Sequence, residues 1–142
     1  MDAQPQASPE GRSGDGSGDG SGDGYLAFQA FHEGSRLLAD SNTHAAVVAL
    51  ERARDLEPDA PSVRETLARA YFRAGNVAAA TDEFQRSVEL DPVNDYAHFG
   101  LGLCLLRRGD QVGARRHLKL AVAMRPESAD YRRALERALR AR

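Results

Sequence analysis

The stretch that decides the fold is "LDPVND" at residues 90–95, because its setting recurs at a fixed interval. A leucine or methionine, one polar residue and a proline occur together again in "LEPDAP" and "MRPESA", so that Pro58, Pro92 and Pro126 are 34 residues apart. Proline cannot continue a helix and commonly follows a helix end. The interval therefore predicts a repeated helical unit of 34 residues, with one proline marking the end of each copy.

The residues between these prolines have the pattern of two helices separated by a short break. In "VRETLARAYFRAGN" (63–76), apolar residues recur at spacings of three and four, which is the period of one helix face. Gly75 then ends this helix, and Asn76 can cap the next one. The same pattern occurs in the copy before, where the break is "DSNTH", and in the copy after, where Gly109 and Asp110 form the break.

A single pair of helices cannot bury its apolar face, so such hairpins stack on one another at a constant period. The last segment, "ESADYRRALERALRAR", has one apolar face and arginines on the others, which is typical of a helix that covers a final repeat. The sequence therefore predicts an all-α solenoid of three hairpins and a terminal helix. The expected helices are about 25–39, 43–56, 61–74, 77–90, 95–108, 111–124 and 128–141.

This 34-residue helical hairpin resembles the tetratricopeptide repeat (TPR) family. In the second copy, the residues at the family's intervals are Leu67, Ala68, Tyr71, Ala80, Phe84 and Pro92. In the third copy they are Leu101, Gly102, Leu105, Ala114, Leu118 and Pro126, and in the first they are Gly34, Leu37, Ala46, Leu50 and Pro58. Glu33 departs from the family pattern, which usually has an apolar residue there. The resemblance implies a right-handed α-solenoid with repeats at about 27–60, 61–94 and 95–128.

The charge of the chain is unevenly distributed, although its net value is only −2. Residues 1–24 carry five acids and one arginine, and "SGDGSGDGSGDG" within them has no apolar side chain, so we expect a flexible acidic tail. Residues 25–100 hold twelve acids and seven arginines, whereas residues 101–142 hold eleven basic and four acidic residues. The C-terminal part is therefore the one suited to anionic partners.

The sequence contains no arrangement typical of an enzyme active site. The four histidines are never three or four residues apart, so no helix carries a pair of metal ligands. Cys104 is the single cysteine, and its apolar neighbours favour a packed, unreactive thiol. The polar runs "TDE" and "LER" are expected to be exposed helix faces. We expect no enzyme activity, no cofactor and no metal, and the lack of a visible signal or apolar span favours a cytoplasmic location.

The resemblance also implies a binding site, because in TPR proteins the first helix of each hairpin lines a concave groove that receives peptides. The residues here that match such groove positions are Phe28, Phe31, His32, Arg69, Phe72, Arg73, Tyr96, Phe99, Leu103, Arg107, Arg133 and Arg137. Aromatic rings with arginines beside them suit a peptide that has bulky apolar anchors and acidic flanks. The alternative is that some of these aromatic residues simply complete the hairpin core.

One subset of TPR proteins grips the C-terminal carboxylates of chaperone tails with lysine, asparagine and arginine. The matching positions here hold Phe31, Ser35, Thr66, Tyr96 and Gly100. None of these side chains can perform that role, so a ligand of another kind is expected.

The leading expectation is a non-catalytic adaptor or scaffold that presents its groove to a segment of a protein partner. One alternative is that the basic residues of 101–142 bind an anionic partner such as nucleic acid through phosphate contacts. Another is self-association through "YLAFQAF" (25–31), which starts the solenoid without a polar cap. A further hypothesis is that the acidic tail lies over the groove and weakens the binding of acidic ligands.

Overall fold

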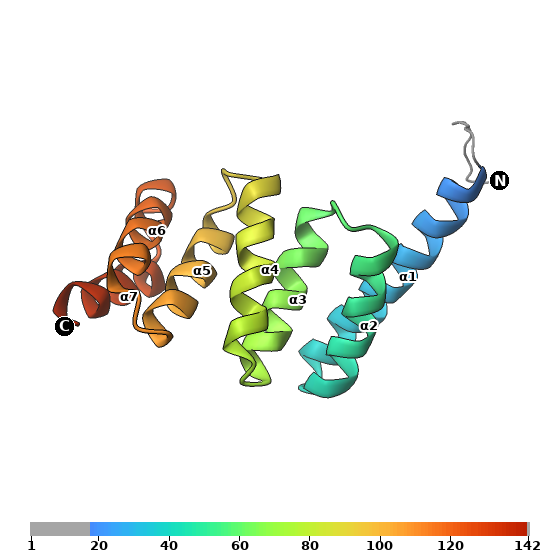
Figure 1. Ribbon diagram of the computed structural model, residues 1–142, viewed down its shortest axis with the longest axis horizontal. Helices are drawn as coiled ribbons and strands as arrows, with labels where there is room; N and C mark the ends of the chain where they lie inside the picture. The colour runs from blue at the N-terminus through green and yellow to red at the C-terminus, as the bar shows by residue number, and fades with distance from the viewer. Residues whose placement is uncertain (1–17, 142) are drawn as a thin grey trace.

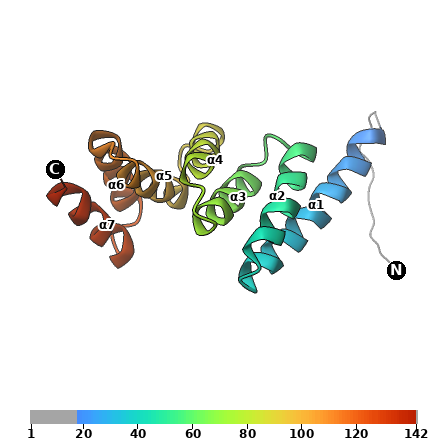
Figure 2. The same cartoon turned by 60° about the horizontal axis from the view of Figure 1, so that its bottom comes forward.

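The computed structural model describes residues 18–141, with side chains from residue 22 onward, and in this range it consists of seven α-helices without a strand. They are α1 (Gly18–Ala39), α2 (Thr43–Leu56), α3 (Pro61–Arg73), α4 (Val77–Leu90), α5 (Asp95–Arg107), α6 (Gln111–Met124) and α7 (Ala129–Arg140). The helices follow one another along the long axis of the molecule, with α1 and α7 at opposite ends (Figure 1). A turned view shows the successive pairs stacked in a row (Figure 2). The predicted all-α solenoid of hairpins is confirmed.

The first helix begins earlier than the sequence predicts, at Gly18 instead of about residue 25. Residues 18–24, which were expected to belong to a flexible tail, are helical, and the rest of that tail, residues 1–17, lies outside the described part of the chain. Once a helix is nucleated, each further residue adds one hydrogen bond, which favours extension from the apolar segment that follows. The other six helices begin and end within one residue of their expected bounds.

Each hairpin turns through one residue with a positive φ angle. Gly75 (φ 85°) and Gly109 (φ 87°) occupy this position in the second and third hairpins, because glycine adopts such an angle without a side-chain clash. In the first hairpin the same position is Ser41 (φ 63°), which adopts this conformation at a cost in free energy. The next residue then bonds back to the helix, as in the 2.9 Å hydrogen bond from Asn76 N to Tyr71 O.

The caps that the sequence predicts are present at the start of α4 and α6. The side chain of Asn76 accepts a hydrogen bond from the backbone N–H of Ala79 over 3.2 Å, and that of Asp110 accepts from Gly113 over 2.9 Å. These caps fix where the second helix of each hairpin starts, and hence which of its faces meets the first helix.

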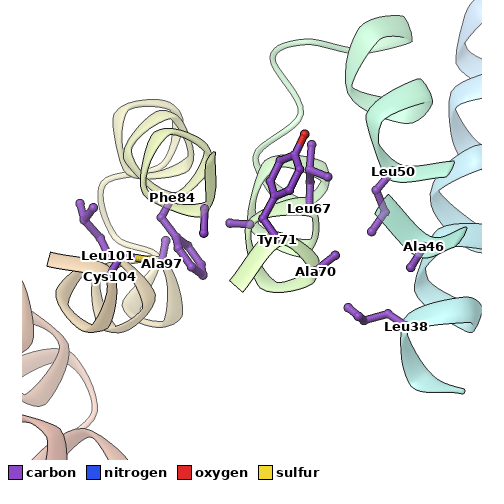
Figure 3. Packing of buried hydrophobic residues seen from close by; sticks show 12 residues of the cluster. Leu38, Ala46, Leu50, Leu67, Ala70, Tyr71, Phe84, Ala97, Leu101 and Cys104 are labelled. Carbon is purple, nitrogen blue, oxygen red and sulfur yellow. The ribbon is translucent and has the colours of Figure 1, made fainter. Parts of the chain in front are cut away.

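The core is a series of buried side chains that the repeat places at the same point of each hairpin. Ala46, Ala80 and Ala114 are completely buried where paired helices pass close to one another. Leu50 and Leu118 are also completely buried, one on α2 and one on α6. Figure 3 shows labelled core side chains of α1 to α5 lying between the helices. Repeating these contacts from one hairpin to the next holds the helices in a row.

The middle hairpin also contains buried charges. Glu83 of α4 is 6% exposed and forms ion pairs with Arg54 of α2 at 2.9 Å and with Arg64 of α3 at 2.8 Å. Thr81 is buried as well, and its hydroxyl donates to a backbone carbonyl of its own helix. The expectation of an exposed face is wrong for Leu50 of "LER", which is completely buried in the core, and for Thr81 and Glu83 of "TDE". For "TDE" the physical reason is that α4 packs against both α3 and α5, so two of its faces are covered.

Candidate functional site

Helices α3 and α5 present side chains around a pocket of about 180 Å³. It is lined by Arg69, Phe72 and Arg73 of α3, Tyr96, Gly100 and Leu103 of α5, and Phe84 of α4. A Cβ atom at position 100 would lie 2.3 Å from the Phe84 ring, so glycine is what allows this ring to approach α5. Five of these residues are ones that the sequence assigns to a groove. The other two, Phe84 and Gly100, are not among the predicted groove residues.

Three arginines beside this pocket are oriented by aromatic rings and by a helix end. The Arg69 guanidinium lies over the Tyr96 ring, 5.6 Å from its centroid, and Arg107 lies over the Phe72 ring at 5.3 Å. Arg73 donates from Nη1 to a backbone carbonyl in the last turn of α1 over 2.9 Å. Within the part of the chain that the structure describes, none of these three arginines forms an ion pair with a carboxylate. Their charges are therefore available to an anionic ligand.

A second pocket, of about 310 Å³, lies between α1 and α3 on the other side of the same arginines. It is lined by Phe31, Ser35, Leu38 and Ala39 of α1 and by Thr66, Arg69 and Arg73 of α3. Thr66 is 8% exposed, and its hydroxyl has no hydrogen-bond partner among residues 22–141. Buried hydroxyls are usually paired, so this one is available to a group that enters the pocket. The two pockets and the arginines that they share are termed the arginine groove below.

Six residues that the sequence assigns to the groove line neither pocket: Arg107 and Phe99, which lie beside the groove, and four residues of the end helices α1 and α7. Phe28 and His32 stack on one another along α1, with ring centroids 6.1 Å apart, and both are exposed. On α7, Arg133 pairs with Asp130 of its own helix, and Arg137 is exposed.

Phe99 has a structural role beside the groove. Its ring stacks on that of Tyr131 of α7, with centroids 4.6 Å apart, and lies 5.8 Å from the ring of Tyr96. Tyr131 in turn donates its hydroxyl proton to Asp95 over 2.6 Å, which docks α7 on the third hairpin. Completion of the core is therefore the better description of Phe99. Tyr96 both packs and lines a pocket, and burial raises the pKa of its hydroxyl, which keeps it neutral.

The sequence reasoning missed four residues that line the pockets: Leu38, Ala39, Phe84 and Gly100. Phe84 was considered only as a residue of the repeat pattern, and Gly100 only as a position at which chaperone-binding TPR proteins grip a carboxylate. A glycine within an otherwise regular helix is itself a signal, because it often marks a place where another group approaches closely.

A pair of histidines joins α5 to α6, and neither histidine lines one of the two pockets. His98 Nε2 lies 2.8 Å from the carbonyl oxygen of Pro92, and because a carbonyl only accepts, this nitrogen carries the proton. His98 Nδ1 then accepts from Nδ1 of His117, 3.0 Å away. Burial, together with the neighbouring His98, lowers the pKa of His117 to about 4. The two residues are 19 apart in sequence, the same separation as Arg64 and Glu83 in the middle hairpin.

The remaining chemistry of the described residues is limited. Cys104 is completely buried, and burial raises the pKa of its thiol, in agreement with the expected packed cysteine. In residues 22–141 no three His, Cys, Asp or Glu side chains come together as a possible metal site. Among the described helices, none is long and apolar enough to cross a membrane.

The N-terminal edge of the solenoid is apolar in one part and polar in another. Tyr25 and Phe28 are 64% and 65% exposed. Gln29, Glu33 and Arg36 are also exposed, at positions whose equivalents 34 residues later are buried apolar residues facing the preceding hairpin. A second copy stacked on this edge would have to cover the 2.8 Å ion pair of Glu33 with Arg36. Self-association through this edge stays a prediction.

Several basic residues of the C-terminal part have partners within the protein. Arg115 donates to two backbone carbonyls at the end of α7, over 2.9 and 3.1 Å, and Arg125 pairs with Asp95 at 2.9 Å. Arg116 and Lys119 are exposed on the outer face of α6. Binding of nucleic acid to this face stays a prediction.

The stacked hairpins and the arginine groove define a class of protein, the helical-repeat solenoid with a groove lined by side chains of its successive hairpins. The chain belongs to the tetratricopeptide repeat family. Models of this family match residues 37–92 and 66–129, which together run from the end of α1 through α2 to α6 to the start of α7.

The relatives that the chain resembles are larger proteins. It is 33% identical over 109 residues to the TPR repeat-containing thioredoxin TTL4 of Arabidopsis thaliana. The match covers 75% of this chain and 16% of that protein. It is 30% identical over 102 residues to the tetratricopeptide repeat and J domain-containing co-chaperone DNJ1 of Cryptococcus neoformans, covering 72% of this chain and 20% of that protein. The chain therefore spans a fifth or less of the length of these two relatives.

Among solved structures, the fold is similar to the first TPR of Spaghetti (RPAP3), bound to the HSP90 peptide SRMEEVD. The TM-score is 0.77 with 17% sequence identity, and the match covers 81% of this chain and 91% of that chain. At this level of identity the likeness concerns the fold.

Proposed function

We propose that this protein is a non-catalytic adaptor that holds a segment of a partner protein in the arginine groove. The observation that carries the proposal is the position of Arg69 and Arg73, which line two pockets and have no acidic partner in residues 22–141. Arginines beside apolar pockets suit an acidic peptide with bulky anchors, because carboxylates bond to the guanidinium fork and the anchors fill the pockets. Membership of the TPR family and the peptide bound to the RPAP3 neighbour support the same function.

The size of the site sets the kind of ligand. A cavity of roughly 150 Å³ is enough to hold a benzene ring, so the 180 Å³ pocket suits one leucine or phenylalanine side chain. A buried side chain of this size and a charge-assisted hydrogen bond each contribute about 1.5–3 kcal/mol. Two anchors and one ion pair together contribute about 5–9 kcal/mol before the cost of association, so these contacts alone correspond to binding weaker than micromolar.

The chaperone peptide of the RPAP3 neighbour does not carry over to this chain. The positions at which chaperone-binding TPR proteins have lysine, asparagine and arginine hold Phe31, Ser35, Thr66, Tyr96 and Gly100 here. The arginines of this groove stand at other positions of α3. We therefore propose recognition of acidic side chains within a segment, in place of a C-terminal carboxylate.

Affinity capture from native lysate with the full chain tests this function. The variant Arg69→Glu with Arg107→Glu reverses two charges that lie over aromatic rings of the groove and form no ion pair within residues 22–141. The matched control, Arg116→Glu with Lys119→Glu, reverses two charges on the exposed outer face of α6. All three proteins must first show the same thermal melt by circular dichroism.

The expected result is a protein that the parent and the control capture and that the groove variant loses. Capture of the same material by all three proteins would refute binding in the groove. Loss with the control alone would assign binding to the basic outer face, and a steep decrease with added salt would then indicate a nucleic acid.

A further inference from the structure

The two pockets of the arginine groove differ in chemistry, and a ligand that fills both must pass the same two arginines. The pocket between α3 and α5 is lined, apart from its arginines, by apolar and aromatic residues. The pocket between α1 and α3 adds the hydroxyls of Ser35 and Thr66. Arg69 and Arg73 line both pockets, so a segment that spans them lies across both guanidinium groups. The groove therefore has three subsites in a fixed order, with the charged one in the middle.

The middle subsite is prepared for a carboxylate. Arg69 is oriented by the ring of Tyr96 and Arg73 by a backbone carbonyl of α1, so neither side chain has to be ordered from a fully mobile state on binding. Glu65 stands one turn before Arg69, but its Oε1 accepts a 2.8 Å hydrogen bond from Nδ2 of Asn94. The charge of Glu65 does act on Tyr96 of the same pocket, but neither Arg69 nor Arg73 forms an ion pair with a carboxylate within residues 22–141.

The outer subsites select different side chains. The 180 Å³ pocket fits a leucine or a phenylalanine, which bring no polar atom. The 310 Å³ pocket is larger and contains the buried, unpaired hydroxyl of Thr66. Leaving a buried hydroxyl unpaired is unfavourable, so this pocket favours a side chain with an apolar body and a polar end, as tyrosine has.

We propose that the groove recognises an extended acidic segment in which one aspartate or glutamate lies between an apolar anchor and a tyrosine, each two residues away. This inference rests on the proposed function, since it specifies the ligand of the same groove. The spacing is part of the proposal and takes the ligand as an extended chain, in which side chains at positions i, i+2 and i+4 point to one side at steps of roughly 6.6 Å. The order of the three subsites permits the segment to lie in either direction.

Selection of a phage-displayed random dodecapeptide library on the full chain tests this order without assuming a ligand. The expected enriched peptides have an acid two residues from an apolar residue and two residues from a tyrosine. The same selection on Phe72→Ala, which removes a wall of the apolar pocket, serves as the comparison. Peptides that enrich equally on both proteins would refute binding in the groove. Peptides that depend on Phe72 but place their acids elsewhere would overturn the order of subsites and leave the groove function standing.

Synthetic peptides then test each subsite by itself, against Arg69→Gln and the isosteric Thr66→Val. Changing the central glutamate to glutamine should weaken binding to the parent about 10- to 100-fold, and binding to Arg69→Gln by much less. Changing the tyrosine to phenylalanine should weaken binding to the parent about fivefold and leave binding to Thr66→Val unchanged. Equal losses on parent and variant would overturn the assignment of the subsite concerned.

Discussion

Replacing Glu83 with alanine should lower the free energy of unfolding by about 3 kcal/mol. The carboxylate is the shared partner of Arg54 and Arg64, at 2.9 and 2.8 Å, and its side chain is 8% exposed. Without it, two arginine side chains that are 24% and 17% exposed lose the acid between them. Breaking a buried ion pair on one side costs about 3–5 kcal/mol. The lower end applies because Arg54 still contacts Asp55, and Arg64 still donates to the carbonyl oxygen of Pro58.

Two further variants separate the loss of charge pairing from the loss of packing. Glu89→Ala removes an exposed pair with Arg86 from the same helix and should change the stability by less than about 0.5 kcal/mol. The triple variant Arg54→Met, Arg64→Met and Glu83→Leu leaves no unpaired buried charge and keeps the side-chain volume similar. It should therefore recover at least about half of the loss seen for Glu83→Ala alone.

Urea unfolding followed by far-ultraviolet circular dichroism measures these differences. For a domain of this size the loss in Glu83→Ala corresponds to a decrease of roughly 10 °C in Tm. If Glu83→Ala and Glu89→Ala agree within about 0.5 kcal/mol, the buried charges do not hold the three helices together and the reasoning fails.

Acid should destabilise the native state from pH 6.5 down to about 4, because folding lowers the pKa of His117 from 6.5 to about 4 and the unfolded chain takes up the proton first. The loss should reach about 2 kcal/mol after allowance for partial exposure, and His117→Gln should remove it whereas His44→Gln should not. Ser41→Gly should stabilise the protein by about 0.5–1 kcal/mol, and Gly75→Ala should destabilise it by about 1–2 kcal/mol, because both positions have a positive φ angle. Urea unfolding measures both changes, and the opposite signs would contradict the role given to this angle. Cys104 should react with Ellman's reagent only after unfolding, because it is buried with a raised thiol pKa, and a rapid reaction in the native state would contradict its packing.

The helical architecture could be predicted because its signals are local. Gly75, Gly109 and the caps that follow them act within one turn of chain, and a constant period then fixes how the hairpins stack. The start of α1 could not be predicted in the same way, because "SGDG" has no signal for a helix and its conformation follows from the helix next to it. Ser41 has the positive φ angle of its equivalents without being a glycine, so composition alone does not identify it.

The candidate site could be predicted in part. Phe72, Arg73 and Tyr96 line the groove because the repeat register assigns the face of each first helix. The repeat register does not determine which side chains meet between helices of different hairpins. These contacts depend on how one hairpin is rotated relative to the next. For that reason the sequence did not separate Phe99, which docks α7, from its neighbours in the groove, or Phe84 from the core.

The three hairpins have different residue pairs at the equivalent position where one side chain of each helix meets the other. In the middle hairpin it holds Arg64 and Glu83, in the third hairpin it holds His98 and His117, and in the first hairpin it holds two alanines. Protonation of a histidine at this position therefore acts on one hairpin of the three. In a solenoid, where each unit contacts only its neighbours, this unit can open without the others.

Helix α5 belongs to that acid-sensitive hairpin and also supplies Tyr96 and Leu103 to the arginine groove. Mild acid should accordingly increase hydrogen exchange in α5 and α6 before it does so in α1 to α4. The groove would then lose one wall while the other stays folded. A partner held between α3 and α5 would be released at a pH at which most of the protein is still native. Ligand retention and global unfolding would therefore follow two separate titration curves.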